Sequence, residues 1–292
     1  MKRYIIYTLS AFAILLLVAC NGGQRTNPEA DFIATIQPIK FIVEQITGDD
    51  FRVDVLVPNG ASPETFEPTP KQFIALNEAK LVFSTGLIDF ESALTESMHD
   101  QRSLINLSRG IELMEGSCSH HHHGHAHSHH HGIDPHIWTS PRELKAMARN
   151  TYEAIIAEYP DSVKYTDAYN ALIHKLNELD IECSQLCKAS SARAFVVYHP
   201  ALTYFSRAYG IEQIAIESDG KEPSAKHLAE IIEQANAKGV TCLLYQAQYP
   251  RSAVEIVAKD MGVECQVFDP LAEDVIENLR SITRLITDNN AQ

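Results

Sequence analysis

The residues from His120 to His131 contain nine histidines, and this tract ends just before the motif Asp134-Pro135-His136-Ile137-Trp138. Neutral imidazole suits zinc, copper and nickel, so a dense run of histidines indicates metal binding. Because the tract offers many overlapping sets of donors, we expect it to bind metal loosely and to exchange it quickly. A solvated low-complexity loop without a role is the alternative reading. The histidines concerned are His120, His121, His122, His123, His125, His127, His129, His130 and His131.

Four further residues that can bind a metal stand at equivalent places in the predicted structure. Glu64 lies in a loop after a predicted strand, His136 precedes a predicted helix, and His199 and Asp269 end buried runs. One such residue alone is more often a hydrogen-bonded surface or capping residue. Four together favour a shared site, in which nitrogen and carboxylate donors would surround zinc at about 2.0–2.2 Å. We expect these four residues to meet in a cleft between two lobes.

The elements that must position these residues alternate between strand and helix in the first part of the chain. Strands are predicted at 32–36, 53–57 and 81–84, with helices at 39–46 and 71–79. Thr69, Pro70 and Gln72 form a capping-box start for the second helix. The loop at 58–68 therefore lies at the carboxyl end of a strand, where open α/β sheets bind ligands.

The middle of the chain changes character. Ser140-Pro141-Arg142-Glu143 predicts a second capping box, which places His136 in the loop that enters a helix. From Tyr165 to Leu186, apolar residues recur at alternating spacings of four and three, as in a long helix with one buried stripe. A coiled coil is less favoured, because the repeat covers only about three heptads and its charges are irregular.

The alternation of strand and helix then resumes. Strands are predicted at 194–199, 213–216, 241–246 and 265–268, with helices at 224–238 and 252–261. The sequence thus predicts an α/β protein of two lobes, each with a parallel-sheet core. One long rigid helix links the lobes, and the metal site lies in the cleft between them.

The first twenty residues indicate the compartment. Lys2 and Arg3 precede an almost uncharged apolar stretch that ends in Leu17-Val18-Ala19-Cys20, as in a bacterial lipoprotein signal. The apolar stretch is shorter than the about 20 residues that a membrane-spanning helix needs. We expect cleavage before Cys20, a lipid on its sulfur, and an extracytoplasmic protein anchored to a bacterial membrane, either at its periplasmic face or at the cell surface.

The expected domains are a signal peptide at 1–19, a lipidated tether at 20–30, an N-terminal lobe at 31–140 with the His-rich loop at 117–132, a helical region at 141–190, and a C-terminal lobe at 191–292. Removal of Lys2 and Arg3 takes the formal net charge from −14 to −16, which argues against nucleic-acid binding. Five cysteines remain beyond Cys20, so at least one thiol is unpaired within the chain. Cys242 and Cys265 are candidates for a bridge, although parallel strands place them awkwardly.

Five segments of the chain resemble those of the metal-specific solute-binding proteins of bacterial ABC importers, the cluster A-I family. These segments are Val57-Pro58-Asn59-Gly60-Ala61-Ser62-Pro63, Phe66-Glu67-Pro68-Thr69-Pro70, Asp134-Pro135-His136-Ile137-Trp138, Tyr198-His199-Pro200-Ala201 and Phe268-Asp269-Pro270-Leu271. The resemblance covers nearly the whole mature chain. It implies two lobes linked by a rigid helix, zinc or manganese as cargo, and an ABC-type permease in the membrane as partner.

One position departs from the family pattern. Glu64, in Pro63-Glu64-Thr65-Phe66, stands where most members carry their first histidine. Either Glu64 binds the metal directly, or Glu67 or a histidine of the tract completes the site. Two nitrogens and two carboxylates favour manganese, whereas the His-rich tract favours zinc. We expect Zn²⁺, with Mn²⁺ as the alternative.

Two functions of other classes compete with transport. A zinc hydrolase needs an open water position and a general base. The sequence contains no His-Glu-x-x-His motif, and nothing singles out Glu67 or Glu217 as a base. A storage lipoprotein or adhesin that uses only the His-rich tract leaves the four strand-end residues unexplained. We therefore expect a monomer without enzymatic activity that captures zinc outside the cytoplasm and delivers it to a permease.

Overall fold

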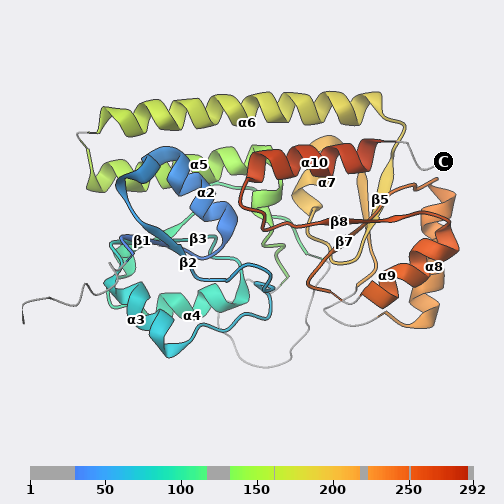
Figure 1. Ribbon diagram of the computed structural model, residues 1–292, viewed down its shortest axis with the longest axis horizontal. Helices are drawn as coiled ribbons and strands as arrows, with labels where there is room; N and C mark the ends of the chain where they lie inside the picture. Colours follow the sequence, from blue (N-terminus) through green and yellow to red (C-terminus); the bar gives the residue numbers. More distant parts are fainter. Residues whose placement is uncertain (1–29, 117–131, 161, 218–222, 250, 289–292) are drawn as a thin grey trace, which may run out of the picture.

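The computed structural model describes residues 30–116, 132–160, 162–217, 223–249 and 251–288 (Figure 1). The predicted signal peptide, Cys20 and the nine histidines of the tract lie outside the described residues. Among the helices that are described, none is both long and apolar enough to cross a membrane.

The N-terminal lobe is built on a four-stranded parallel sheet in the order β2-β1-β3-β4. Its strands are β1 (Phe32–Ala34), β2 (Val53–Val55), β3 (Leu81–Ser84) and β4 (Leu104–Asn106). Its helices are α2 (Gln37–Thr47), α3 (Pro70–Glu78) and α4 (Asp89–Ser97). All four residues of β3 are buried, as expected for a strand covered by helices on both faces. Figure 1 shows α3 and α4 on the side of the sheet opposite α2.

The C-terminal lobe repeats this topology, with four parallel strands in the order β6-β5-β7-β8. Its strands are β5 (Ala194–Val197), β6 (Glu212–Ala215), β7 (Leu243–Gln246) and β8 (Cys265–Phe268). Its helices are α7 (Thr203–Tyr209), α8 (Ala225–Ala237) and α9 (Arg251–Met261). In both sheets the strand order reverses beside the first strand, and open α/β sheets bind ligands at the carboxyl ends next to such a reversal.

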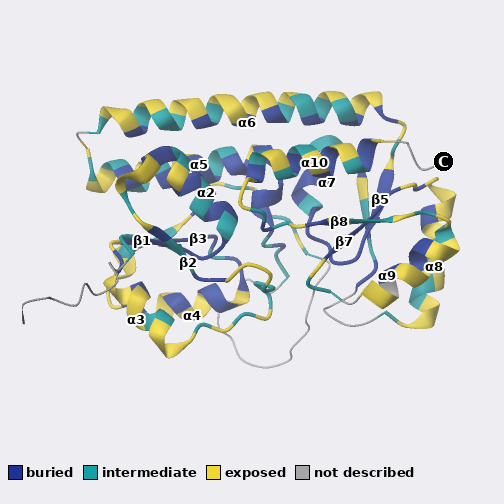
Figure 2. Ribbon diagram, in the orientation of Figure 1, coloured by how far each residue is buried: buried dark blue, intermediate teal, exposed yellow. Residues whose placement is uncertain are grey.

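A layer of helices joins the two lobes. It consists of α5 (Pro141–Glu158), α6 (Val163–Ala189) and α10 (Val275–Thr287), and α6 runs along most of the molecule above both sheets (Figure 1). One stripe of α6 is buried, from Tyr165 through Leu172 and Leu176 to Cys187, while its outer face is exposed (Figure 2). The predicted two-lobed fold with a long helix is confirmed, and α5 and α10 widen the link into a layer.

The hydrophobic core follows from the alternation of side chains along the strands of the second sheet. Phe195 and Val197 of β5 belong to a cluster that continues through the helix layer into the N-terminal lobe. Ala194 and Val196 point to the other face and pack with α8 and α9 in a separate cluster. Because one apolar core runs through both lobes and the helix layer, the lobes are firmly attached to α6.

The two predicted helix starts have different outcomes. Thr69 and Gln72 form the expected capping box at the start of α3. At α5 the predicted box is wrong: Ser140 accepts a hydrogen bond from the Arg142 amide, and Glu143 does not reach back to it. The reason is a cation from another helix, since the carboxylate of Glu143 lies 2.7 Å from the guanidinium of Arg207.

Several parts of the fold are additions to the sequence prediction. The sequence does not predict helices α4, α7 and α10 or strand β4, and of these only α10 is longer than nine residues. The four described cysteines, Cys183, Cys187, Cys242 and Cys265, are free, so the candidate bridge between Cys242 and Cys265 is not formed.

Candidate metal centre

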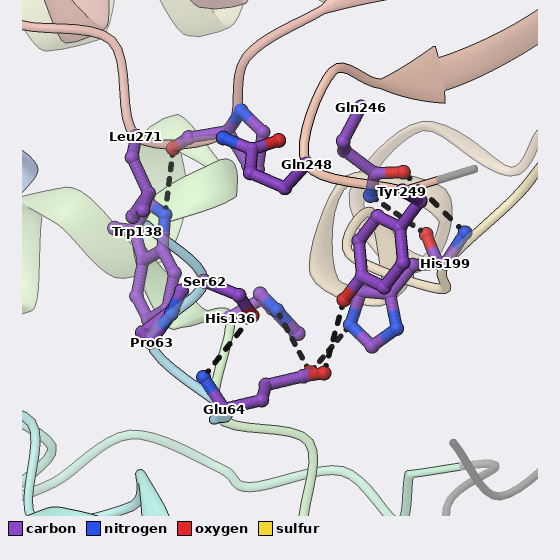
Figure 3. Close-up of a pocket in the computed structure, with 11 residues that line it drawn as sticks. Ser62, Pro63, Glu64, His136, Trp138, His199, Gln246, Gln248, Tyr249 and Leu271 are labelled. Carbon is purple, nitrogen blue, oxygen red and sulfur yellow. Dashed lines mark hydrogen bonds and ion pairs between the residues drawn. The ribbon is translucent and has the colours of Figure 1, made fainter. Parts of the chain in front are cut away.

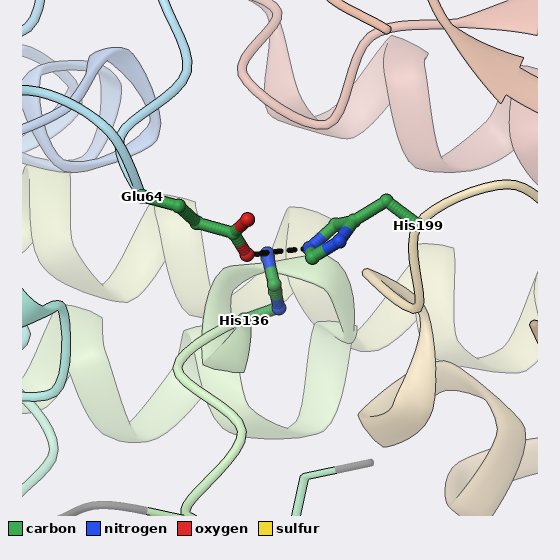
Figure 4. A group of neighbouring side chains, drawn as sticks. All are labelled: Glu64, His136 and His199. Atoms are coloured by element: carbon green, nitrogen blue, oxygen red, sulfur yellow. Dashed lines mark ion pairs between the residues drawn. The ribbon is translucent and has the colours of Figure 1, made fainter. Parts of the chain in front are cut away.

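Three of the four predicted metal ligands meet between the lobes. Glu64, in the loop after β2, comes from the N-terminal lobe, and His199, just after β5, comes from the C-terminal lobe. His136 reaches the same place from the segment before α5. One potential ligand atom from each residue lies within 4.8 Å of the others (Figure 4). This group lines a pocket that also contains Trp138 and Tyr249 (Figure 3).

His136 is fixed by its neighbour in the chain, Asp134. The side chain of Asp134 accepts a hydrogen bond from the His136 amide at 2.8 Å and pairs with Nδ1 of its ring at 2.9 Å. Both residues are buried. Burial opposes the charge of Asp134, but the adjacent His136 outweighs it and holds the pKa of this carboxyl below its usual value. With Nδ1 engaged, Nε2 of His136 is the nitrogen that faces Glu64.

His199 is held in the same manner by a residue that is distant in sequence. Its Nδ1 lies 3.0 Å from the carboxylate of Glu217, which follows β6 and is buried. Gln246 binds the backbone of His199, and the ring of Tyr249 stacks on the imidazole with centroids 5.2 Å apart. Histidines that bind a metal commonly donate the N–H of their other ring nitrogen to a carboxylate. This hydrogen bond fixes the orientation of the ring and raises its basicity.

The protonation of His199 depends on the carboxylates on its two sides. Burial lowers its pKa, but the hydrogen bond between Nδ1 and Glu217 and the negative charge of Glu64 beside Nε2 more than offset this and raise the pKa to about 9. The pKa of Glu64 is lowered: burial opposes its charge, but its interactions with His199, His136 and Tyr249 outweigh that effect. A proton and a metal ion therefore compete for the same nitrogen of His199.

The distances around Glu64 fit a metal site after a small adjustment. Oε1 of Glu64 lies 3.9 Å from Nε2 of His136 and 2.5 Å from Nε2 of His199. Ligand atoms of tetrahedral zinc stand about 3.4 Å apart, given bonds of about 2.0–2.1 Å. Despite its short distance from Glu64, the buried Nε2 of His199 has no properly aligned hydrogen-bond partner among the described residues. A modest rotation of the Glu64 side chain, which is 31% exposed, would make room for an ion between the three groups.

Asp269, the fourth predicted ligand, is outside this group. One of its carboxylate oxygens accepts a hydrogen bond from the Leu271 amide at 2.9 Å. Asp269 lines a neighbouring pocket with Asn59 and Gln37, while the next two residues, Pro270 and Leu271, line the pocket of the metal group. Its role as a ligand stays a prediction.

Sequence reasoning missed most of the residues that hold the ligands in place. The sequence indicates Glu217 only as a candidate base and Asp134 only as part of a motif, and it gives no signal for Tyr249. The hydroxyl of Tyr249 donates to Oε2 of Glu64 at 3.1 Å. Trp138 packs beside His136 at 5.1 Å between ring centroids, and its indole nitrogen donates to the carbonyl of Pro270 across the cleft. Only Asp134, two residues from His136, could have been found from spacing.

The comparison with protein families decides the relationship. A family described as zinc-uptake complex component A, periplasmic, and called ZnuA, matches residues 33–289, nearly all of the described chain. The chain belongs to the ZnuA family. The resemblance to the metal-specific solute-binding proteins is thereby confirmed. Members of the ZnuA family are described as a component of an uptake complex, which is not a class of enzymes.

Individual relatives agree with this assignment. The high-affinity zinc uptake system protein ZnuA of Bacillus subtilis is 31% identical over 274 residues, which is 89% of this chain and 86% of that protein. A crystal structure of ZnuA has 32% identity and a TM-score of 0.79, covering 88% of this chain and 97% of the other. The zinc-binding lipoprotein AdcA of Streptococcus pneumoniae is 28% identical over 90% of this chain, which spans about half of that relative (54%).

Proposed function

We propose that this protein captures zinc in the cleft between its lobes and hands it to the membrane permease of an ABC-type importer. The observation that carries the proposal is the convergence of Glu64, His136 and His199, with each imidazole fixed through Nδ1 by a buried carboxylate. A pre-oriented pair of imidazoles has no evident structural purpose at the meeting point of two lobes. In a member of a zinc-uptake family it suits a cargo site.

Zinc is the cargo that the neighbours favour over manganese. The Bacillus subtilis and Streptococcus pneumoniae relatives are named for zinc, and a zinc-bound deletion mutant of ZnuA has a TM-score of 0.78 at 32% identity. The protein FpvC, whose structure contains Mn²⁺, is only 21% identical to this chain, so its similarity supports the fold and not the identity of the metal.

The proposed cycle uses the ligands as bridges between lobes. Glu64 supplies an oxygen from one lobe and His199 a nitrogen from the other, so the bound ion holds both lobes together. We propose Asp269 as the fourth ligand, reached by a movement of its loop, since the residues that follow it already line the site. Opening of the cleft on the permease would separate these ligands and free the ion. The protein then acts as a carrier without catalysing a reaction.

The test is the metal content of the mature chain, with the nine histidines of the tract replaced by serine, after zinc and manganese compete at neutral pH. We expect one tightly bound zinc, which His199→Ala and Glu64→Ala each remove. His174→Ala is the matched control, since His174 is an exposed histidine of α6 that pairs with Glu178. Selective retention of manganese would change the cargo, and no retained metal would refute the cleft site.

We further propose the domain division given above, with a lipid on Cys20 and residues 20–30 as a tether. The names of relatives support an extracytoplasmic lipoprotein. Replacement of Cys20 by serine should move the protein from the membrane fraction to the soluble one. Two outcomes would contradict a lipid anchor on Cys20. One is a Cys20→Ser variant that still sediments with membranes, and the other is an unsubstituted protein that incorporates no labelled palmitate.

We also propose that the protein is a monomer with no nucleic-acid partner, and that the tract collects zinc for the cleft. Loss of the nine histidines should slow zinc uptake only when zinc is scarce. Unchanged uptake under scarcity would refute this role for the tract.

A further inference from the structure

Tyr249 touches two of the proposed ligands at once. Its hydroxyl donates to Oε2 of Glu64 at 3.1 Å, and its ring lies nearly parallel to that of His199, at 15° (Figure 3). Tyr198 packs on the same tyrosine at 5.1 Å between ring centroids. Tyr249 is therefore held by aromatic contacts from its own lobe while it binds a carboxylate of the other lobe.

This contact divides the two oxygens of Glu64. Oε1 faces Nε2 of both histidines, whereas Oε2 is engaged by the phenol of Tyr249. A carboxylate with both oxygens free can bind a metal through one or both of them, and hard cations commonly take both. A carboxylate with one oxygen already hydrogen-bonded favours binding through the other alone.

We propose that Tyr249 is a positioning residue that restricts Glu64 to binding through one oxygen, and that it thereby favours four-coordinate zinc over manganese. This inference rests on the proposed zinc site and adds the origin of its selectivity. It also explains how Glu64 is tolerated as a ligand: with one oxygen held, it presents a single donor atom, as an imidazole would.

The selectivity follows from the number of donors that each ion prefers. Zinc in proteins is usually tetrahedral, so a single oxygen from Glu64 is enough beside two imidazoles and one more ligand. Manganese favours an octahedral set rich in oxygen. Keeping Oε2 away from the metal therefore lowers the affinity of the site for manganese, which would use this donor, and changes the affinity for zinc little.

The experiment replaces Tyr249 by phenylalanine in the mature chain that carries serines in place of the tract histidines. Phenylalanine keeps the ring that stacks on His199 and removes only the hydroxyl. We expect the ratio of zinc to manganese affinity to fall by about tenfold or more, as the loss of a hydrogen bond to a charged group predicts. Tyr209→Phe is the matched control, because Tyr209 donates to Asp180 at 3.1 Å outside the metal group, and it should leave the ratio unchanged.

A second background isolates the role of the carboxylate. In a Glu64→His chain there is no second oxygen to withhold, so Tyr249→Phe should leave the ratio as it is. An unchanged ratio in the native background overturns the proposal. So does an equal change in both backgrounds, because the hydroxyl of Tyr249 would then act independently of the Glu64 carboxylate.

Cobalt(II) provides a direct reading of coordination. Four-coordinate cobalt absorbs visible light strongly and six-coordinate cobalt weakly, so the bands of the native protein should be strong and should weaken in Tyr249→Phe. Weak bands in the unsubstituted protein would overturn the proposal even if the variant does not fold. Failure of all metals to bind would instead refute the proposed function, which separates the two ideas.

Discussion

In the proposed zinc site, the carboxylates behind the two histidines would contribute to metal binding without touching the ion. Asp134 and Glu217 each hold one Nδ1, so that both Nε2 atoms face Glu64. A fixed and more basic imidazole binds a metal more tightly than a free one. The strength of the site therefore depends on residues that carry no metal-binding signature of their own.

Glu217→Gln tests this dependence. The change keeps the shape of the side chain and removes the charge beside His199, so zinc affinity should fall by about 10- to 100-fold. Glu212→Gln is the control, since Glu212 pairs with Lys238 on the surface of the same lobe. Competition against a fluorescent chelator measures both variants. Equal affinities for the two would show that Glu217 does not support the site.

The protonation of His199 predicts how zinc binding depends on pH. Its pKa of about 9 means that the metal-free imidazole is charged at neutral pH, whereas zinc requires the neutral form. Binding should therefore release a proton, and affinity should rise about tenfold per pH unit up to about pH 9 before levelling off. Calorimetry in two buffers of different ionisation enthalpy counts the protons. A binding enthalpy independent of buffer would contradict the predicted charge.

Among the elements, α6 stabilises the molecule through a single stripe. Leu176 is 1% exposed and packs into the core that joins both lobes, whereas Ile181 on the same helix is 58% exposed. The two residues are nearly equal in size and differ mainly in the face of the helix that they occupy. Stability should therefore depend on one face of α6 and hardly on the other.

Leu176→Ala should lower the free energy of unfolding by about 2–5 kcal/mol, because it removes apolar contacts and leaves a cavity. Ile181→Ala should change it by about 0.5 kcal/mol or less, as is usual for surface positions. Urea denaturation of the metal-free protein gives both values. Similar losses for the two variants would mean that the exposed face of α6 is covered in solution.

At the scale of the whole molecule, the site lies where the lobes meet, and several contacts cross the cleft. Glu64 pairs with His199 and Tyr249, and Trp138 donates to Pro270. An ion that binds ligands from both lobes stabilises the folded arrangement over the unfolded chain by mass action.

Zinc at about 100 times its dissociation constant should raise the free energy of unfolding by about 2.7 kcal/mol. Glu64→Ala should abolish most of this gain, although Glu64 is the least buried of the three ligands. Scanning calorimetry with the tract histidines replaced measures the shift, and His174→Ala should retain it in full. A gain that survives the loss of Glu64 would place the zinc elsewhere.

The sequence by itself determined the parts that local forces control. Apolar runs such as Leu81–Ser84 had to be strands, the Thr69 capping box had to begin a helix, and His136, His199 and Asp269 had to stand at the ends of elements. These features arise from hydrogen bonds and side-chain spacing within a few residues.

Only the tertiary structure decided which residues support the ligands. Glu217 and His199 are 18 positions apart, and Tyr249 and Glu64 are 185 positions apart, so no local pattern joins either pair. The same holds for Glu143, which pairs with Arg207, 64 positions away, instead of closing a capping box at the start of its own helix. Charged and hydrogen-bonding groups pair with the groups that packing places next to them. These neighbours are in place only after both sheets have packed against the helix layer.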